Sequence, residues 1–160
     1  MKRFLCLLCV LCLLPVLAVC DDYDYDYVVA IIDIMMESYG CLEMPEKYYT
    51  TQNDDGTENR HFFFSDDLKI IIETDGEKVY RVSAACFHNN NLRDFFVACL
   101  AELTAFDISF DSASSALFSG YLFSESGESM PTSYENGLYS DMAYYPEKEM
   151  LMFFLMKPGV

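Results

Sequence analysis

The stretch LKIIIETDGEKVYRVSAACF, residues 68 to 87, decides the fold because it encodes two strands joined by a tight turn. Asp75 and Gly76 separate two runs rich in β-branched residues, and an Asp-Gly pair suits a two-residue turn that needs positive φ at both positions. Such a turn pairs Glu73 with Lys78 and Ile72 with Val79. We expect one apolar face of this hairpin to meet helices, and its residues are Leu68, Ile70, Ile72 and Val79.

Further strands are predicted on both sides of this hairpin. KYYTTQ (residues 47–52) and HFFF (residues 61–64) precede it, separated by the turn-forming segment NDDGTEN. The chain closes with LYSDMAYY and EMLMFFLM around a turn at Pro146, which predicts a final hairpin. Residues 150–156 are apolar at every position, a pattern typical of a central strand covered on both faces.

Three segments have helical periodicity. The first begins at Val28 and ends at Gly40, with its acids on the side opposite its apolar stripe. A second begins near Asn91, with Asp94 at the N3 position of its cap. A third, weaker helix is capped by Asp111 or Ser112, and residues 124–137 are predicted as a long loop.

The sequence therefore predicts a single α+β domain over residues 28–160. It consists of an antiparallel sheet of about five or six strands with two or three helices packed mainly on one face. The alternative is a mixed sheet with helices on both faces, which the apolar run at residues 150–156 favours.

The first twenty residues have the pattern of a secretory signal peptide. Lys2 and Arg3 precede an uncharged run that ends at Cys20 and is shorter than the ~20 residues of a spanning helix. Cleavage after Cys20 leaves small residues at positions −3 and −1, and the leader resembles those of anaerobic Gram-positive bacteria. We expect a secreted or extracytoplasmic protein without a stable transmembrane anchor after processing. The segment LAVC also resembles a bacterial lipobox, so the alternative is a lipid anchor at the cell surface through Cys20.

The charge of the chain bounds its partners. The formal net charge is −16, and removal of Lys2 and Arg3 with the leader makes it −18. Nucleic acid is an improbable partner because phosphate binding requires clustered basic residues. Residues 21–27, DDYDYDY, are predicted as an acidic N-terminal arm. Its tyrosines at positions 23, 25 and 27 resemble the sulfated tyrosines of animal secreted proteins, which form anionic docking arms.

Few residues of the mature chain suit catalysis or metal binding. Cys41, Cys86 and Cys99 remain after cleavage, an odd number that argues for small buried hydrophobes rather than a disulfide scaffold. Cys86 and His88 could meet as a nucleophile and base if their strand continued, but HNNN at residues 88–91 reads as a loop.

No cofactor is expected. A calcium loop at residues 54–59 lacks EF-hand spacing and is better explained as a hairpin turn. A carboxylate pair of the glycosidase type has no fixed sequence signature and could be present among the 26 acids.

The aromatic and methionine residues of the last hairpin suit either a core or a binding face. They are Tyr139, Met142, Tyr144, Tyr145, Met150, Met152, Phe153, Phe154 and Met156. If one face of the sheet lacks helices, the first candidates for partner binding there are Tyr48, Tyr80, Tyr144 and Tyr145. The sequence thus favours a non-catalytic binding module at or outside the cell envelope, engaging another protein or an envelope polymer. The alternatives are a small carboxylate-dependent hydrolase and a carrier of a small apolar ligand.

Overall fold

A computed structural model describes residues 23–157 as three helices and seven strands with one short 3-10 turn. The predicted leader, including Cys20, lies outside the described residues. In chain order the elements are α2 (Tyr25–Ser38), β1 (Tyr49–Gln52), β2 (Glu58–Phe63), β3 (Leu68–Thr74), β4 (Val79–Phe87), α3 (Leu92–Ala105), α4 (Phe110–Glu125), β5 (Thr132–Ser133), β6 (Tyr139–Tyr145), η2 (Pro146–Lys148) and β7 (Met150–Met156).

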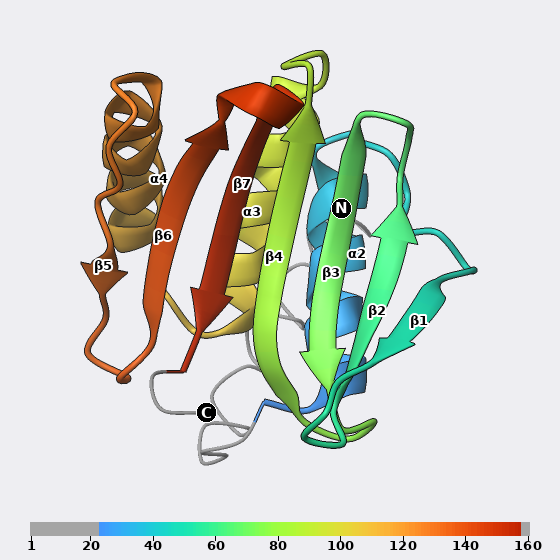
Figure 1. Cartoon of the computed structure of the whole chain (residues 1–160). Helices are drawn as coiled ribbons and strands as arrows, with labels where there is room; N and C mark the ends of the chain where they lie inside the picture. The colour runs from blue at the N-terminus through green and yellow to red at the C-terminus, as the bar shows by residue number, and fades with distance from the viewer. Residues whose placement is uncertain (1–22, 158–160) are drawn as a thin grey trace, which may run out of the picture.

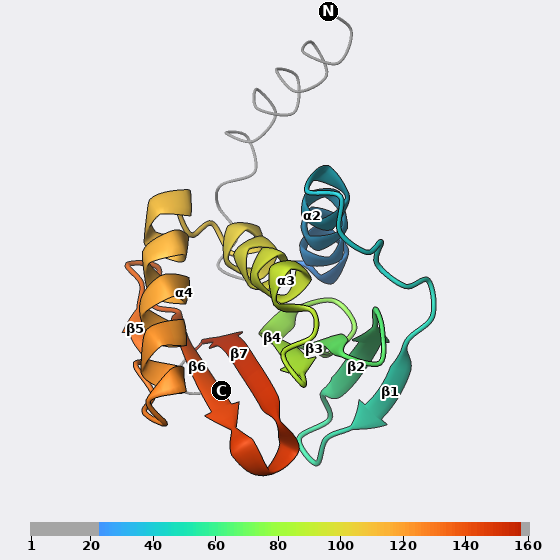
Figure 2. The ribbon, with the colours of Figure 1, turned by 90° about the horizontal axis from the view of Figure 1, so that it is seen from above.

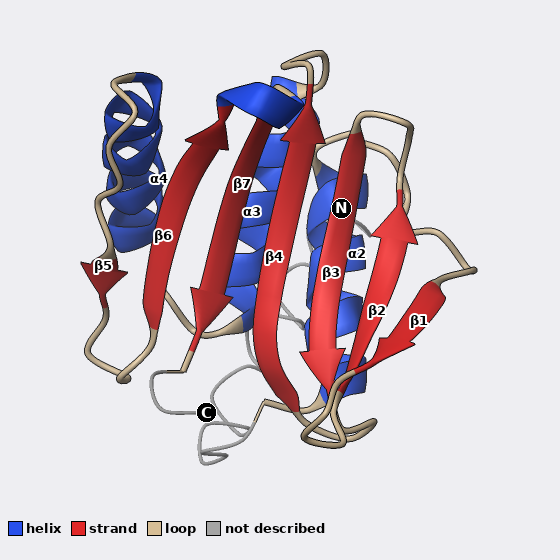
Figure 3. Ribbon diagram, viewed as in Figure 1, coloured by secondary structure: helices blue, strands red, loops and turns tan. Residues whose placement is uncertain are grey.

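The described strands form one antiparallel sheet in the order β1-β2-β3-β4-β7-β6-β5. All three helices lie on the same side of it (Figures 1 and 2). The predicted α+β class is therefore confirmed, with seven strands where five or six were expected. The alternative of a mixed sheet with helices on both faces is wrong. Figure 3 shows the strands in front and the helices behind them.

The hairpin of β3 and β4 forms, but in a different register from the prediction. Thr74 pairs with Val79 and Glu73 pairs with Arg81, so Tyr80 is an extra residue and makes a β-bulge. Val79 nevertheless keeps its predicted place on the buried face. Because Tyr80 is inserted, Val82, Ala84 and Cys86 lie on the same covered face as Val79 and continue its apolar surface.

The turn of this hairpin is wider than two residues, so the predicted pair of Glu73 with Lys78 does not form. Asp75 stabilises the wider turn, because its Oδ1 accepts hydrogen bonds from the backbone N–H of Glu77 at 3.0 Å and of Lys78 at 2.8 Å. Gly76 supplies a φ of +103°, a value that side chains disfavour.

Residues 23–27 belong to the folded domain rather than to an exposed arm. The carbonyl of Tyr23 accepts a hydrogen bond from the N–H of Val79 at 2.8 Å, and Asp24 caps α2 by accepting from the N–H of Tyr27. Tyr25 is buried, and the guanidinium of Arg60 lies 4.1 Å from the centre of its ring. Helix α2 therefore begins three residues before Val28, because Asp24 is a good N-cap residue.

The other two helices differ from the prediction at their caps. Asn91 occupies the N-cap position of α3, but its side chain makes no capping hydrogen bond. Helix α4 is capped by Ser109, whose hydroxyl accepts from the N–H of Ser112, so the helix begins before the predicted caps. It also extends to Glu125, inside the segment expected as a loop, and β5 forms later in that same segment.

The core lies between the helices and the covered face of the sheet. Helix α4 approaches β6 closely at Gly120, where a Cβ atom would lie 3.1 Å from the Cβ of Met142. The core also contains a carboxyl group without a partner. Glu102 of α3 is fully buried, and neither of its carboxyl oxygens has a hydrogen-bond partner among the described residues. Burial raises the pKa of Glu102 well above its usual range.

Candidate functional site

The face of the sheet opposite the helices carries no covering element among residues 23–157, and we call it the open face (Figures 1 and 2). Side chains alternate along each strand, so the residues between the core positions point to this face. On the four central strands these residues are Lys69, Ile71 and Glu73 of β3, Arg81, Ser83, Ala85 and Phe87 of β4, Met150, Met152, Phe154 and Met156 of β7, and Tyr139, Asp141, Ala143 and Tyr145 of β6.

The open face is uneven at its centre. Strand β4 contributes the small residues Ser83 and Ala85, whereas the adjacent strand β7 contributes Met152, Phe154 and Met156. A shallow hollow of about 300 Å³ lies over this part of the sheet and includes Ser83 among its lining residues. Ser83, 4% exposed, therefore lies in a hollow beside large, adaptable apolar side chains of β7, whereas Ala85, 1% exposed, is covered by its neighbours.

Charges on the central strands of the open face are few and balanced. Arg81 forms an ion pair with Glu73 at 2.7 Å. Lys69 and Asp141 form no ion pair with any residue in 23–157, although Lys69 lies 5.7 Å from the centre of the Phe87 ring. Burial lowers the pKa of Lys69, and the positive charge of the nearby Lys148 lowers it further by a smaller amount.

His61 of β2 lies beside these residues at the rim of the hollow. Its Nε2 is 3.0 Å from the hydroxyl of Thr51 on β1. Burial, with a smaller contribution from Lys69, lowers the pKa of His61, so the imidazole is neutral near pH 7.

The four tyrosines nominated from the sequence do not gather on one surface. Tyr145 lines the hollow of the open face. The ring of Tyr48 packs at a tilt against Phe62 of the covered face, and Tyr144 is half-buried against the core. Tyr80 occupies the β-bulge, and its hydroxyl donates to Asp75 at 2.8 Å.

Sequence reasoning named the β6 and β7 residues of the hollow as suited to either a core or a binding face, but it missed those of β2, β3 and β4. Tyr139, Met152 and Phe154 line it together with Arg81 and His61. The signal was present in the unbroken apolar run of β7, which the sequence analysis assigned to a strand covered on both faces. The β7 residues that point to the open face are apolar, although no described element covers them.

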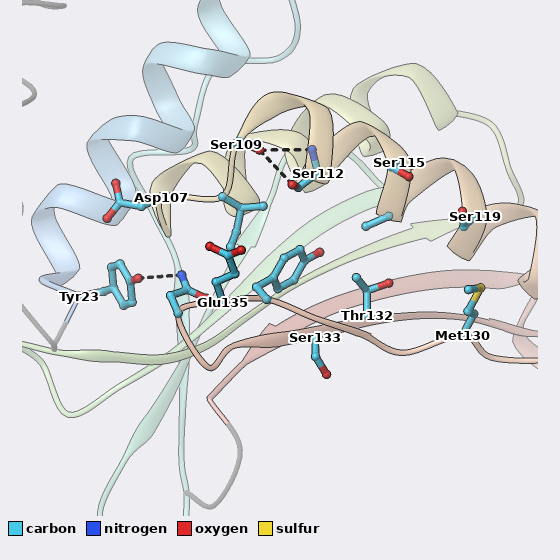
Figure 4. Close-up of a pocket in the computed structure, with 14 residues that line it drawn as sticks. Tyr23, Asp107, Ser109, Ser112, Ser115, Ser119, Met130, Thr132, Ser133 and Glu135 are labelled. Atoms are coloured by element: carbon cyan, nitrogen blue, oxygen red, sulfur yellow. Dashed lines mark hydrogen bonds between the residues drawn. The ribbon is translucent and has the colours of Figure 1, made fainter.

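A second, larger hollow of about 670 Å³ lies between α4 and the segment of residues 130–136 (Figure 4). Hydroxyl-bearing residues line most of it, namely Tyr23, Ser109, Ser112, Ser115, Ser119, Thr132, Ser133 and Tyr134. We call it the hydroxyl-lined groove. Its other lining residues include Asp107 and Glu135 but no basic residue, which disfavours an anionic ligand.

The end of this groove is held in place by Asn136. Its Nδ2 donates to the hydroxyl of Tyr23 at 3.2 Å and to the carbonyl of Phe106 at 3.0 Å. Figure 4 shows the Tyr23 bond and the bonds that join Ser109 to Ser112. These contacts fix the turn after β5 against the end of α3, and so they define the groove structurally without bringing a nucleophile and a base together.

The remaining catalytic and metal candidates do not converge. Cys86 is buried on the covered face, whereas His88 follows the end of β4 with a φ of +57° and an exposed side chain near Asp67. Cys41, Cys86 and Cys99 are free thiols, and burial raises the pKa of each.

The acidic β1–β2 turn behaves as a hairpin turn. Asp55 Oδ1 accepts from the N–H and hydroxyl of Thr57, and Glu58 pairs with Arg60 at 2.6 Å. Within residues 23–157, no group of three or more His, Cys, Asp or Glu side chains is arranged to hold a metal ion.

No family model matches the chain, and neither the curated proteins nor the solved structures contain a significant match to it. In the described part of the chain, no helix has both the length and the apolar character that crossing a membrane requires.

Proposed function

We propose that the protein is an exported, non-catalytic binding module that engages another macromolecule at or outside the cell envelope through its open face. One observation carries this proposal: the centre of the sheet presents an apolar, aromatic and methionine-rich surface on the side that the helices leave uncovered. Contiguous apolar patches on the surface of a soluble protein usually mark interaction sites.

The composition of the open face supports a protein partner. Tyrosine, phenylalanine, methionine and arginine are enriched in the centres of protein interfaces, whereas charged residues as a class are depleted there. The central strands of the open face include only two acids, Glu73 and Asp141, in a chain that has 26. The negative charge is therefore concentrated on the helices and loops, where it favours solubility and disfavours nucleic acid.

Export is part of the proposal because residues 1–20 read as a signal peptide. A free extracytoplasmic form follows from cleavage after Cys20, and a surface-anchored form follows from lipidation of Cys20. Mass spectrometry of the accumulated protein separates the two, since a lipid-modified Cys20 adds the mass of its acyl chains.

Site-specific photo-crosslinking in cells that produce the protein tests the binding face. A benzophenone amino acid replaces Tyr145, which is 36% exposed on the open face, or Phe118, which is 67% exposed on α4. We expect a discrete crosslinked adduct from position 145 and none from position 118. Phe118 is the matched control because it is the more exposed of the two aromatic residues, so chance encounters favour it.

Adducts of equal yield from both positions, or none from position 145, would contradict the proposal. A companion variant, Phe154→Asp, introduces a charge into the hollow that Tyr145 also lines and should abolish the adduct. Circular dichroism of this variant establishes that the loss does not come from unfolding.

A carboxylate-dependent hydrolase is the second candidate, because Asp107 and Glu135 line the hydroxyl-lined groove. A general acid of this kind is usually a carboxyl held in an apolar pocket, whereas both of these side chains are exposed. Hydrolysis of a panel of aryl glycosides by the wild-type protein, lost in both Asp107→Asn and Glu135→Gln, would favour this candidate over the binding module.

The third candidate, a carrier of a small apolar ligand, requires a cavity between the helices and the sheet. Of the two hollows, the hydroxyl-lined groove lies between α4 and the edge strand β5, but its lining is rich in hydroxyl groups. This lining gives a carrier of an apolar ligand little support.

A further inference from the structure

We propose that the macromolecule bound by the open face is a second copy of this chain, so that the protein is a two-fold symmetric dimer with its sheets packed face to face. This inference rests on the proposed function, since it names the partner of the same surface. Two features of the open face carry it, namely its relief and the arrangement of its charges.

The relief of the open face is complementary to itself. Register pairs Ser83 with Phe154 and Ala85 with Met152, so each small residue of β4 stands beside a large residue of β7. A two-fold axis that runs between these strands, parallel to them and in the plane of the interface, places β4 of each copy against β7 of the other. Phe154 of one copy then lies over Ser83 of the other, so each copy places an aromatic side chain against the hollow of its partner.

The charges of the open face fit the same axis, which also places β3 of one copy against β6 of the other. Lys69 lies at the level of Ala143 in the sheet. Ala143 is two residues, about 7 Å, along β6 from Asp141. Within one chain these two side chains stand three strands apart, about 14 Å at the usual spacing, and neither has an ion-pair partner among the described residues. The two-fold axis brings Lys69 of each copy near Asp141 of the other.

Electrostatic repulsion does not oppose this arrangement strongly, even though each chain carries a net charge of −16. The helices lie on the far side of each sheet, so their exposed acids, such as Asp33 and Glu37 of α2, face away from the partner copy (Figure 2). Such a contact is isologous and closes after two copies, so it does not propagate into a filament. Aligned packing of two twisted sheets is a common architecture with the layers about 10 Å apart.

Sedimentation of the full chain, purified in the form that accumulates on expression, tests the inference. We expect the mass of a dimer that dissociates on dilution over about 1 to 100 µM. Phe154→Asp should weaken association by about 100-fold or more, because it places a charge in the centre of the interface. Phe118→Asp on α4 is the matched control and should leave the dimer unchanged.

A charge-reversal cycle tests the axis itself. Lys69→Glu and Asp141→Lys should each weaken the dimer by about 10-fold, and the double variant should restore it to near the wild-type value. A merely structural role for either residue predicts additive losses instead. Circular dichroism and thermal melting establish that each variant is folded.

Each outcome decides between this inference and the broader proposal. A monomer at every concentration overturns the dimer, and so does a dimer that Phe154→Asp leaves intact. If the monomer still yields a heterologous adduct from a crosslinker at position 145, the open face binds a different partner and the proposed function stands. If the monomer yields no adduct, both proposals fail.

Discussion

The two faces of the sheet differ in what covers them but not in how apolar their central strand is. On β7, Leu151, Phe153 and Leu155 are buried under the helices, whereas Met152, Phe154 and Met156 alternate with them on the open face. An ordinary half-solvated strand would place polar residues at the second set of positions. Strand β7 therefore has the apolar pattern of a strand covered on both sides, whereas the described residues place helices on one side of it alone.

Strand β3 makes the contrast clear because it lies in the same sheet and alternates differently. Its covered residues are Leu68, Ile70 and Ile72, and its open-face residues include Lys69 and Glu73. The apolar surface of the open face therefore centres on β7 rather than extending evenly across the sheet.

The largest expected effect comes from the neighbouring pair Phe153 and Phe154. Phe153→Ala should lower the free energy of unfolding by about 3 to 5 kcal/mol, since it leaves a cavity in a core where Phe153 is 2% exposed. Phe154→Ala should cost less than about 1.5 kcal/mol under conditions where the protein is monomeric, because its side chain is only half-buried. Urea denaturation at low protein concentration measures both, and equal losses would remove the distinction between the faces.

A carboxylate is fully buried on the helix side of the sheet, at Glu102, but is partly exposed and paired on the open face, at Glu73. Glu102 provides the second test. Because burial raises its pKa, the folded state binds the proton more tightly than the unfolded chain. The contribution of Glu102 to stability should therefore be greatest below its unfolded pKa of about 4.3 and should fall as the pH rises from there towards the folded pKa. Glu102→Met should remove this slope and raise the free energy of unfolding at pH 7 by about 1 to 3 kcal/mol.

Glu73 on the open face is the matched control for Glu102. It is paired with Arg81 at a partly exposed position, so Glu73→Gln should change the free energy of unfolding by less than about 1 kcal/mol. Denaturation curves recorded between pH 4 and pH 9 compare the two variants. An unchanged pH slope in Glu102→Met would show that another group is responsible.

A smaller effect is expected at the helix that covers the edge of the sheet. Ser109→Ala removes the N-cap of α4 and should cost about 1 kcal/mol. Ser115→Ala, in the interior of the same helix and at an exposed position, should be neutral or slightly stabilising because alanine favours helix. Thermal unfolding of the two variants gives the comparison, and a greater loss from Ser115→Ala would assign the structural role to the groove instead of the cap.

The smallest effect concerns the β3–β4 turn at the end of the sheet. Hydrogen bonds from the backbone of Lys78 and Glu77, and then from the hydroxyl of Tyr80, lower the pKa of Asp75 to about 2. The stability that these bonds give is present above the unfolded pKa of Asp75 and is lost as the pH falls through about 2. Tyr80→Phe should raise the pKa of Asp75 only part of the way towards 3.8, since the backbone donors remain, and an NMR titration of the side-chain carboxyl measures this.

Much of the fold could be predicted from local patterns. The alternation in residues 68–72, the Asp-Gly turn and the helical spacing after Val28 are properties of short segments, and each leads to the element that the structure contains. Register and caps were less predictable. The bulge at Tyr80 depends on a competition between the narrow turn and the wider one that Asp75 stabilises, and Ser109 competes for the cap with two equally suitable residues after it.

The sequence by itself determined the α+β class, the antiparallel hairpins and the acid-rich surface, because periodicity, turn chemistry and net charge act over a few residues or over the whole composition. The sequence also predicted helices mainly on one face, but only the tertiary structure decided which side of β7 they cover and that Ser83 lies beside Phe154. Those facts depend on contacts between residues far apart in the chain, and no local pattern records which side of a uniformly apolar strand the helices will cover.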